Sequence, residues 1–301
     1  MGALSELEIL AFLRARFPGG EALTDDCGAV PPAPAGEVLL ATTDLLEEGI
    51  HFRRAWTPPE PLARKLLAVN LSDLDASGAR PAGFLLTLAL PADLERAWLE
   101  TFLGALADAA RAAGVPVLGG DTVGRTGGLG LGITAFGHAA RWLRRDGLRP
   151  GDTLFVDQPL GASLRGLRKL EAGSRDLSDP DIAAHLDPKP NLGLGVRLAA
   201  IPEVHACMDL SDGLSRDLRT LARASGVSVE VDAALGPDAL QGGEDYARCF
   251  GSSLAQGELE ARLGRPLIPV GRAIPEEGTP VFLYDGKIRR PLPDLSFDHF
   301  R

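Results

Sequence analysis

Short apolar runs that stop at an aspartate recur in this sequence, and this pattern limits the possible fold more than any other feature. The first run, residues 38–41, leads directly into Thr42, Thr43 and Asp44. Runs of four to eight apolar residues are typical of strands that are buried on both faces. We therefore predict a strand that ends where these hydroxyl and carboxylate groups begin. A single aspartate at such a position is also typical of an ordinary turn.

The same arrangement recurs further along the chain. Residues 116–118 lead through two glycines into Asp121, and residues 204–208 lead into Asp209. Asp73 lies on a predicted helix. Ligands of open sheets gather beyond the carboxyl ends of the strands, so we expect these carboxylates to converge. Converging carboxylates repel one another unless cations intervene, and oxygen ligands are those that Mg²⁺ prefers. The pattern predicts several Mg²⁺ ions that bind phosphate groups.

The length of the chain indicates two domains. The chain of 301 residues exceeds the size at which one core stops growing. Helical and strand patterns alternate along it, and residues 144–152 are polar and rich in turn-forming residues. We therefore expect an N-terminal domain over residues 1–148 and a C-terminal domain over residues 149–301.

Charge and motif content exclude several classes of function. A net charge of −10 and a pI near 5.1 argue against nucleic-acid or anionic-membrane partners, which favour basic surfaces. There is no phosphate-binding loop of the GxxxxGK[ST] type, and no GxSxG or HExxH motif. The three cysteines form no CxxC pair, which favours reduced, buried thiols and a cytoplasmic location. No apolar run is long enough to span a bilayer.

A set of ordered motifs points to a known family. The segments TDDC, TTDLLEEGIHF, AVNLSDLDASGA, GGDT, MDLSDGL and GGEDY, in this order, resemble those of the thiamine-monophosphate kinases, within the aminoimidazole-ribotide synthetase-like superfamily. The resemblance implies two domains of the α/β (α+β) class, with N-terminal sheets that pair across a homodimer into a shared β-barrel. It implies that residues 1–148 bind ATP and Mg²⁺ and form the dimer, and that residues 149–301 are a C-terminal α/β domain that completes the nucleotide and substrate site. It also implies direct transfer of the γ-phosphoryl group of ATP to thiamine monophosphate, which gives thiamine diphosphate and ADP.

The resemblance also implies a role for particular residues. The Mg²⁺ ligands would be Asp26, Thr42, Thr43, Asp44, Asp73, Asp121, Asp209 and Asp212. The ATP contacts would be Gly120, Asp121, Arg145 and Ser211, and the contacts to thiamine monophosphate would be His51, Glu244 and Phe297. No residue is expected to act as a general base, because a phosphate monoester is already largely dianionic at neutral pH. Positioning and charge neutralisation should dominate catalysis.

Other interpretations of these residues remain open. An extra Gly28 leaves both Asp25 and Asp26 as possible ligands, and the short segment 233–241 changes one wall of the substrate pocket. Arg145 is also consistent with a solvated arginine, and His51 with a structural histidine. The alternative function is another ATP-dependent enzyme of the aminoimidazole-ribotide synthetase/selenophosphate synthetase superfamily that acts on a different acceptor. A noncatalytic regulator that binds metal or nucleotide is a more remote alternative. Asp44→Asn would discriminate it from an enzyme, because a regulator has no turnover to lose.

Overall fold

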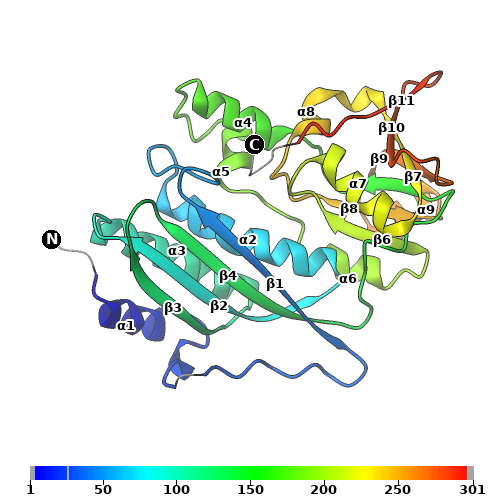
Figure 1. Cartoon of the computed structure of the whole chain (residues 1–301). Helices are drawn as coiled ribbons and strands as arrows, with labels where there is room; N and C mark the ends of the chain where they lie inside the picture. Colours follow the sequence, from blue (N-terminus) through cyan, green and yellow to red (C-terminus); the bar gives the residue numbers. More distant parts are fainter. Residues whose placement is uncertain (1–3, 26, 297–301) are drawn as a thin grey trace. The chain divides into compact units, whose positions relative to one another are not determined.

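A computed structural model gives the fold, and it describes residues 4–25 and 27–296. The chain divides into two compact units (Figure 1). The first comprises residues 1–74 and 80–139, and the second comprises residues 75–79 and 140–301. Asp26 and Phe297, both predicted site residues, lie outside the described residues. The roles predicted for residues 1–148 and 149–301 stay predictions.

The first unit contains a four-stranded sheet in the order β1-β4-β2-β3 (Figure 1). Strand β4 is antiparallel to both β1 and β2, whereas β3 is parallel to β2. The strands are β1 (Val38–Glu47), β2 (Arg80–Pro91), β3 (Val117–Arg125) and β4 (Gly130–Ala139). The helices are α1 (Glu6–Arg16), the short η1 (Gly20–Ala22), α2 (Pro59–Ala76) and α3 (Arg96–Ala113).

Two helices of this unit cover one face of its sheet. Figure 1 shows α2 and α3 behind the strands. Helix α3 buries Leu99, Phe102 and Leu106, whose spacing of three and four residues places them on one side of the helix. Leu131 and Ile133 of β4, two residues apart, are buried as well. Period-two alternation along β4 therefore assigns this face of the sheet to the core.

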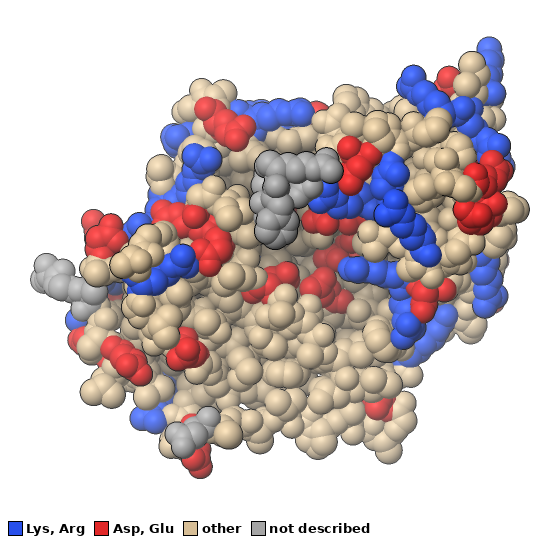
Figure 2. Space-filling model, in the orientation of Figure 1, with Lys and Arg blue, Asp and Glu red and all other residues tan. Residues whose placement is uncertain are grey.

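The opposite face of the sheet, which we call the outer face, is exposed and largely apolar. Leu39 and Leu45 of β1 are 42% and 51% exposed, and Val123 of β3 is 45% exposed. Figure 2 shows few charged side chains over these strands. The strand registers place the following residues on the outer face: Leu39, Ala41, Thr43, Leu45, Thr134, Phe136, Thr87, Asp121 and Val123.

The second unit contains a seven-stranded sheet in the order β11-β10-β7-β9-β5-β8-β6. Its strands are β5 (Thr153–Val156), β6 (Val204–Asp209), β7 (Ser228–Asp232), β8 (Arg248–Ser252), β9 (Ile268–Ile274), β10 (Val281–Tyr284) and β11 (Arg289–Pro291). Its helices are α4 (Ala162–Glu171), α5 (Pro180–Leu186), α6 (Leu194–Ala199), α7 (Leu214–Ser225), η2 (Ala233–Leu235), α8 (Gly236–Gln241) and α9 (Gln256–Leu263).

Both faces of this second sheet are buried. Val156 of β5 belongs to a core cluster with Leu218 of α7. Its neighbour Phe155 points to the other face, where it belongs to a second cluster with Leu198 of α6 and Leu259 of α9. A strand that is covered on both sides reads as a continuous apolar run, as residues 154–156 do. The mixed α/β class predicted from the sequence is confirmed.

Two of the predicted strand ends are wrong. Strand β1 continues to Glu47, and β3 continues to Arg125, so that Asp44 and Asp121 lie inside strands. The pairing of β1 with β4 runs through these polar residues, with Asp44 opposite Ile133. A polar side chain does not end a strand whose backbone ladder continues. By contrast, Asp209 is the last residue of β6, as predicted.

The three cysteines are free thiols. Cys27 is exposed, whereas Cys207 and Cys249 are buried in the second unit. Within the described part of the chain, no helix combines the length and the apolar character that a membrane crossing requires.

Candidate active site

In the first unit, strand β1 and helix α2 bring three of the predicted ligands together. Thr42 and Asp44 are two residues apart in β1 and share the face that points away from the outer face. The Thr42 hydroxyl donates a hydrogen bond of 2.5 Å to Oδ2 of Asp73 on α2. The backbone N–H of Asp44 donates to Oδ1 of Asn70, at 3.0 Å. Because Asn70 and Asp73 are three residues apart on the helix, one helix face aligns both contacts.

The structure separates two other predicted residues from this group. Thr43 points to the outer face, where its hydroxyl contacts the Ile133 carbonyl at 3.1 Å and the Thr134 hydroxyl at 3.0 Å. Asp121 also lies on the outer face, opposite Thr87 in the parallel pair of β2 and β3. Strands β1 and β3 are three strand spacings apart, or roughly 14 Å. The carboxylates of Asp44 and Asp121 in one chain therefore project from opposite faces and distant edges.

Gly120 faces the core side of β3 and is needed for packing. A Cβ atom at this position would lie 2.0 Å from the backbone oxygen of Leu86. No side chain fits there without a shift of the backbone. Close packing against β2 therefore explains why this position is glycine, which the sequence alone did not reveal.

A second set of acids gathers where β6 meets α7 in the second unit. Asp209 ends β6 and is only 2% exposed, and Asp212 follows in the loop. Asp217, which the sequence analysis missed, accepts hydrogen bonds from the N–H groups of Asp212 at 3.2 Å and Gly213 at 3.1 Å. Burial raises the pKa of Asp217 well above its usual range, and the nearby charges of Asp212 and Asp209 raise it further. A cation would relieve this repulsion.

The loop that carries GGEDY lies beside this second set. The N–H of Glu244 donates to the Ser211 carbonyl at 2.8 Å. The Asp245 carboxylate is buried and accepts hydrogen bonds from the N–H groups of Gly161 and Ser163, at 2.6 and 3.3 Å. Burial raises the pKa of Asp245 in spite of these contacts. Asp245 therefore holds the loop against the start of α4, whereas the side chain of Glu244 is partly exposed to solvent.

His51 has a defined tautomer. Its Nδ1 lies 3.0 Å from the backbone nitrogen of Glu47, which is a donor. Nδ1 must accept this hydrogen bond, so a neutral His51 carries its proton on Nε2. The contact closes the turn that follows β1, which is the structural interpretation, and it makes Nε2–H the donor of the ring.

Arg145 is exposed, and the structure gives its guanidinium no ion pair with any described residue. Its backbone carbonyl accepts a hydrogen bond from Ser225 at 2.8 Å, which holds the backbone against α7. The neighbouring Arg144 is bound instead to Asp146, at 2.7 Å. The structure thus leaves Arg145 accessible for an anionic ligand as well as for solvent.

The donors present suit a hard cation. Carboxylates and a threonine hydroxyl offer only oxygen ligands, which are those of Mg²⁺ rather than of zinc. Over residues 4–25 and 27–296, no group of three or more Asp, Glu, His or Cys side chains is arranged to hold a metal ion without further ligands. Such incomplete sites are typical for Mg²⁺, which retains several waters and binds through substrate phosphates.

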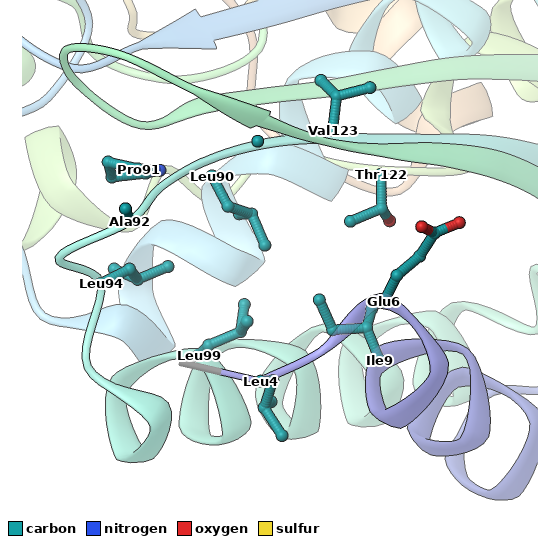
Figure 3. A pocket seen from close by; sticks show the side chains of 11 residues that line it. Leu4, Glu6, Ile9, Leu90, Pro91, Ala92, Leu94, Leu99, Thr122 and Val123 are labelled. Carbon is teal, nitrogen blue, oxygen red and sulfur yellow. The ribbon is translucent and has the colours of Figure 1, made fainter. Parts of the chain in front are cut away.

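A cavity in the first unit lies apart from these residues. It has a volume of about 230 Å³ and lies between α1, α3 and the ends of β2 and β3 (Figure 3). Ile9, Leu90 and Leu99 make its wall mostly apolar, with Glu6 as its carboxylate. None of the predicted site residues lines it, so we do not assign it to the reaction.

Comparison with known proteins agrees with the arrangement of these motifs. Residues 24–139 match the family described as AIR synthase related protein, N-terminal domain, and residues 120–255 match its C-terminal domain. A thiamine-monophosphate kinase of Escherichia coli K12 is 36% identical over 300 residues, which covers 92% of this chain and 90% of the relative.

Solved structures give the same result. The crystal structure of a thiamine-monophosphate kinase from Stenotrophomonas maltophilia K279a has a TM-score of 0.77 and 33% identity, covering 93% of this chain and 96% of that one. A structure described as AaThiL complexed with AMPPCP and TMP has a TM-score of 0.76 and 28% identity, covering 99% of this chain and 97% of that one.

Proposed function

The chain belongs to the thiamine-monophosphate kinase family, and from this premise we propose how its residues carry out the ATP-dependent phosphorylation of thiamine monophosphate. The observation that carries the function is the match over nearly the whole length of both chains. The reaction transfers the γ-phosphoryl group of ATP to the phosphate of thiamine monophosphate, giving thiamine diphosphate and ADP. The acceptor is already dianionic, so repulsion between two polyanions is the main barrier.

We propose that Thr42, Asp44 and Asp73 of the first unit bind Mg²⁺, and that Asp209 and Asp212 of the second unit do so as well. The hydrogen bond between Thr42 and Asp73 holds these donors together before a cation arrives, which supports the assignment. When bound, Mg²⁺ neutralises the phosphate oxygens of the two substrates. Thr43 and the undescribed Asp26 remain candidates, and Asp25 is the alternative to Asp26. The Thr43 hydroxyl points to the outer face, so Thr43 could bind a cation beside Asp44 only through a main-chain atom.

The remaining roles concern the substrates. We propose that Gly120, Asp121, Arg145 and Ser211 contact ATP, where Arg145 adds a charge that is not lost by deprotonation. His51, through Nε2–H, and Glu244 would contact thiamine monophosphate, together with Phe297. The exposed Arg145 and the partly exposed Glu244 are accessible enough for these roles. A reaction that consumes ATP, together with free thiols, fits the cytoplasm that we propose as its location.

We propose further that the enzyme is a homodimer whose subunits pair through the outer face. An apolar sheet face of this kind needs cover, and a second copy of the same face supplies it with two-fold symmetry. The placement of Asp121 also favours a dimer. Asp44 and Asp121 of one chain project from opposite faces, so Asp121 would serve the Mg²⁺–ATP complex held by the partner subunit.

The function is tested by incubating the purified chain with ATP, Mg²⁺ and thiamine monophosphate. We expect thiamine diphosphate and ADP in equal amounts, and failure to form thiamine diphosphate would contradict the function and favour another acceptor. Asp44→Asn should lower kcat at least ~10²-fold, by analogy with the loss of one transition-state donor. Asp93→Asn, an exposed carboxylate of the same unit, is the control. Full turnover by Asp44→Asn would refute the metal assignment.

The dimer is tested separately by light scattering and by mixing variants. Leu45→Lys on the outer face should give monomers. Leu7 of α1 is 78% exposed, and Leu7→Lys should leave the dimer intact. If Asp121 acts in the partner's site, inactive Asp44→Asn and Asp121→Asn chains that exchange subunits should regain about a quarter of wild-type activity, because each mixed dimer has one intact site. No recovery, with subunit exchange demonstrated, would place both residues in the same subunit's site.

A further inference from the structure

The loop around Glu244 is held in a backbone conformation that its residues rarely adopt. Glu244 and Tyr246 have positive φ angles, of 61° and 48°, although neither is glycine. Such conformations persist where the surroundings determine them, and they are frequent at ligand sites. Backbone hydrogen bonds from Glu244 to the Ser211 carbonyl and from Tyr246 to the Leu210 carbonyl supply this restraint. The backbone of Glu244 is therefore fixed beside the second set of acids.

The side chain of Glu244 is fixed as well. Its Oε2 lies 3.2 Å from Nδ1 of His185 on α5, and the same nitrogen lies 3.0 Å from the hydroxyl of Ser163 on α4. His185 and Ser163 are only 5% and 1% exposed, while the Glu244 side chain is 23% exposed. An ionised carboxylate only accepts hydrogen bonds, so a proton on Nδ1 of His185 would lie between two acceptors, the Glu244 carboxylate and the Ser163 hydroxyl. Nδ1 of His185 thus connects the buried Ser163 hydroxyl with an accessible acid.

We propose that His185, supported by Ser163, is a positioning residue that orients the Glu244 carboxylate for the organic part of the substrate. This inference rests on the substrate role proposed above for Glu244. Thiamine monophosphate carries a permanently cationic thiazolium ring and an aminopyrimidine with N–H donors, and a fixed carboxylate complements either group. His185 reaches the substrate only through Glu244, and it confers specificity for the acceptor by limiting the carboxylate to one orientation.

Substitutions at His185 distinguish this role from a general contribution to folding. His185→Leu removes the donor and should raise KM for thiamine monophosphate about tenfold, as expected for the loss of one charge-assisted hydrogen bond. KM for ATP should stay within about twofold of wild type on the same grounds. His185→Asn offers an amide N–H near the place of Nδ1–H and should restore KM for thiamine monophosphate to within about threefold.

A matched control comes from another buried histidine of the same unit. His205 contacts Asp152 at 3.0 Å through Nδ1, with both side chains at most 9% exposed, and neither has a proposed role in the reaction. His205→Leu should therefore leave both KM values unchanged, even where it lowers thermal stability. If His205→Leu raised KM for thiamine monophosphate as much as His185→Leu does, the effect would be one of general stability and the proposal would be wrong.

A second measurement does not depend on His185→Leu being stable. If His185 acts through Glu244, Ser163→Ala should raise KM for thiamine monophosphate in the wild type but not in a Glu244→Gln background. Additive effects in that background refute the proposal, as does a wild-type KM in His185→Leu. An inactive wild-type chain would instead refute the proposed function, so the two failures are distinguishable.

Discussion

Replacing Arg248 by leucine tests how the interior of the second unit depends on one buried charge pair. The Arg248 side chain is completely buried, and its Nε donates to Oδ2 of Asp75 at 2.7 Å. Asp75 also accepts hydrogen bonds from the N–H groups of Gly193, at 2.6 Å, and Gly195, at 3.1 Å. Burial acts to lower the pKa of Arg248, but the charges of Asp75 and Asp209 outweigh it, so the pKa lies above its usual value. Arg248 therefore remains charged over the normal range of pH.

The expected magnitude follows from this burial. Removing one partner of a buried pair leaves the other charge uncompensated, which costs about 3–5 kcal/mol. We expect Arg248→Leu and Asp75→Asn each to lower the free energy of unfolding by that amount. The double variant leaves neither charge of the pair behind. The amide introduced at position 75 has one oxygen, so it can accept a hydrogen bond from only one of the two glycine N–H groups. The double variant should therefore lower the free energy of unfolding by only about 1–2 kcal/mol, mostly because the other glycine N–H loses its acceptor.

Urea unfolding followed by circular dichroism measures these free energies. Arg144→Leu breaks the pair of Arg144 with Asp146, whose side chains are 53% and 42% exposed, and should cost less than about 1 kcal/mol. The reasoning is refuted if Arg248→Leu behaves like this exposed control. It is also refuted if the losses in the two single variants simply add in the double variant, because a coupled pair cannot be additive.

Three further predictions concern other parts of the chain. A thiol reagent should label Cys27 quickly in the native protein, whereas the two buried cysteines, whose pKa values burial raises, should react only after unfolding. The backbone N–H of Ser5 is the main cause that lowers the pKa of Glu8 from 4.5 to about 2 in the folded protein. The ionised Glu8 therefore contributes to the free energy of unfolding in full above pH 4.5, and this contribution is lost as the pH falls toward 2. The difference in unfolding free energy between wild type and Glu8→Gln should shrink over the same range. Gly120→Ala should lower the free energy of unfolding by about 1–3 kcal/mol through its clash with a backbone oxygen, whereas Gly124→Ala, with no atom within 4 Å of its Cβ, should change it by less than about 0.5 kcal/mol.

Local sequence patterns predict those helices and strands in which apolar residues are buried and polar residues are exposed. Helix α7 and strand β5 follow from signals within their own segments, because the left-handed Gly226 ends α7 and a short apolar run forms β5. Strand β8 was missed, although all of its residues are buried, because Arg248 interrupts its apolar run. The partner that makes this arginine tolerable lies 173 residues away in the sequence, where no local rule detects it.

The candidate site was predictable to a similar degree. The motifs identified most of the acids, but the apolar runs misplaced the ends of β1 and β3. Period-two alternation alone would have separated Thr43 from Thr42 and Asp44 once the length of the strand was known. His185 is a lone histidine in a short helix without a motif, so only its contact with Glu244 gives it a possible role.

Strand β1 carries a constraint on sequence change that no other strand of its sheet carries to the same extent. Its alternate residues point toward the proposed metal ligands on one face and toward the proposed subunit contact on the other. A single inserted or deleted residue ahead of Thr42 would exchange the two sets, with leucines toward the cation and Asp44 toward the partner subunit. We therefore expect length changes to be tolerated in the connection over residues 31–36, which precedes β1, but not within the strand.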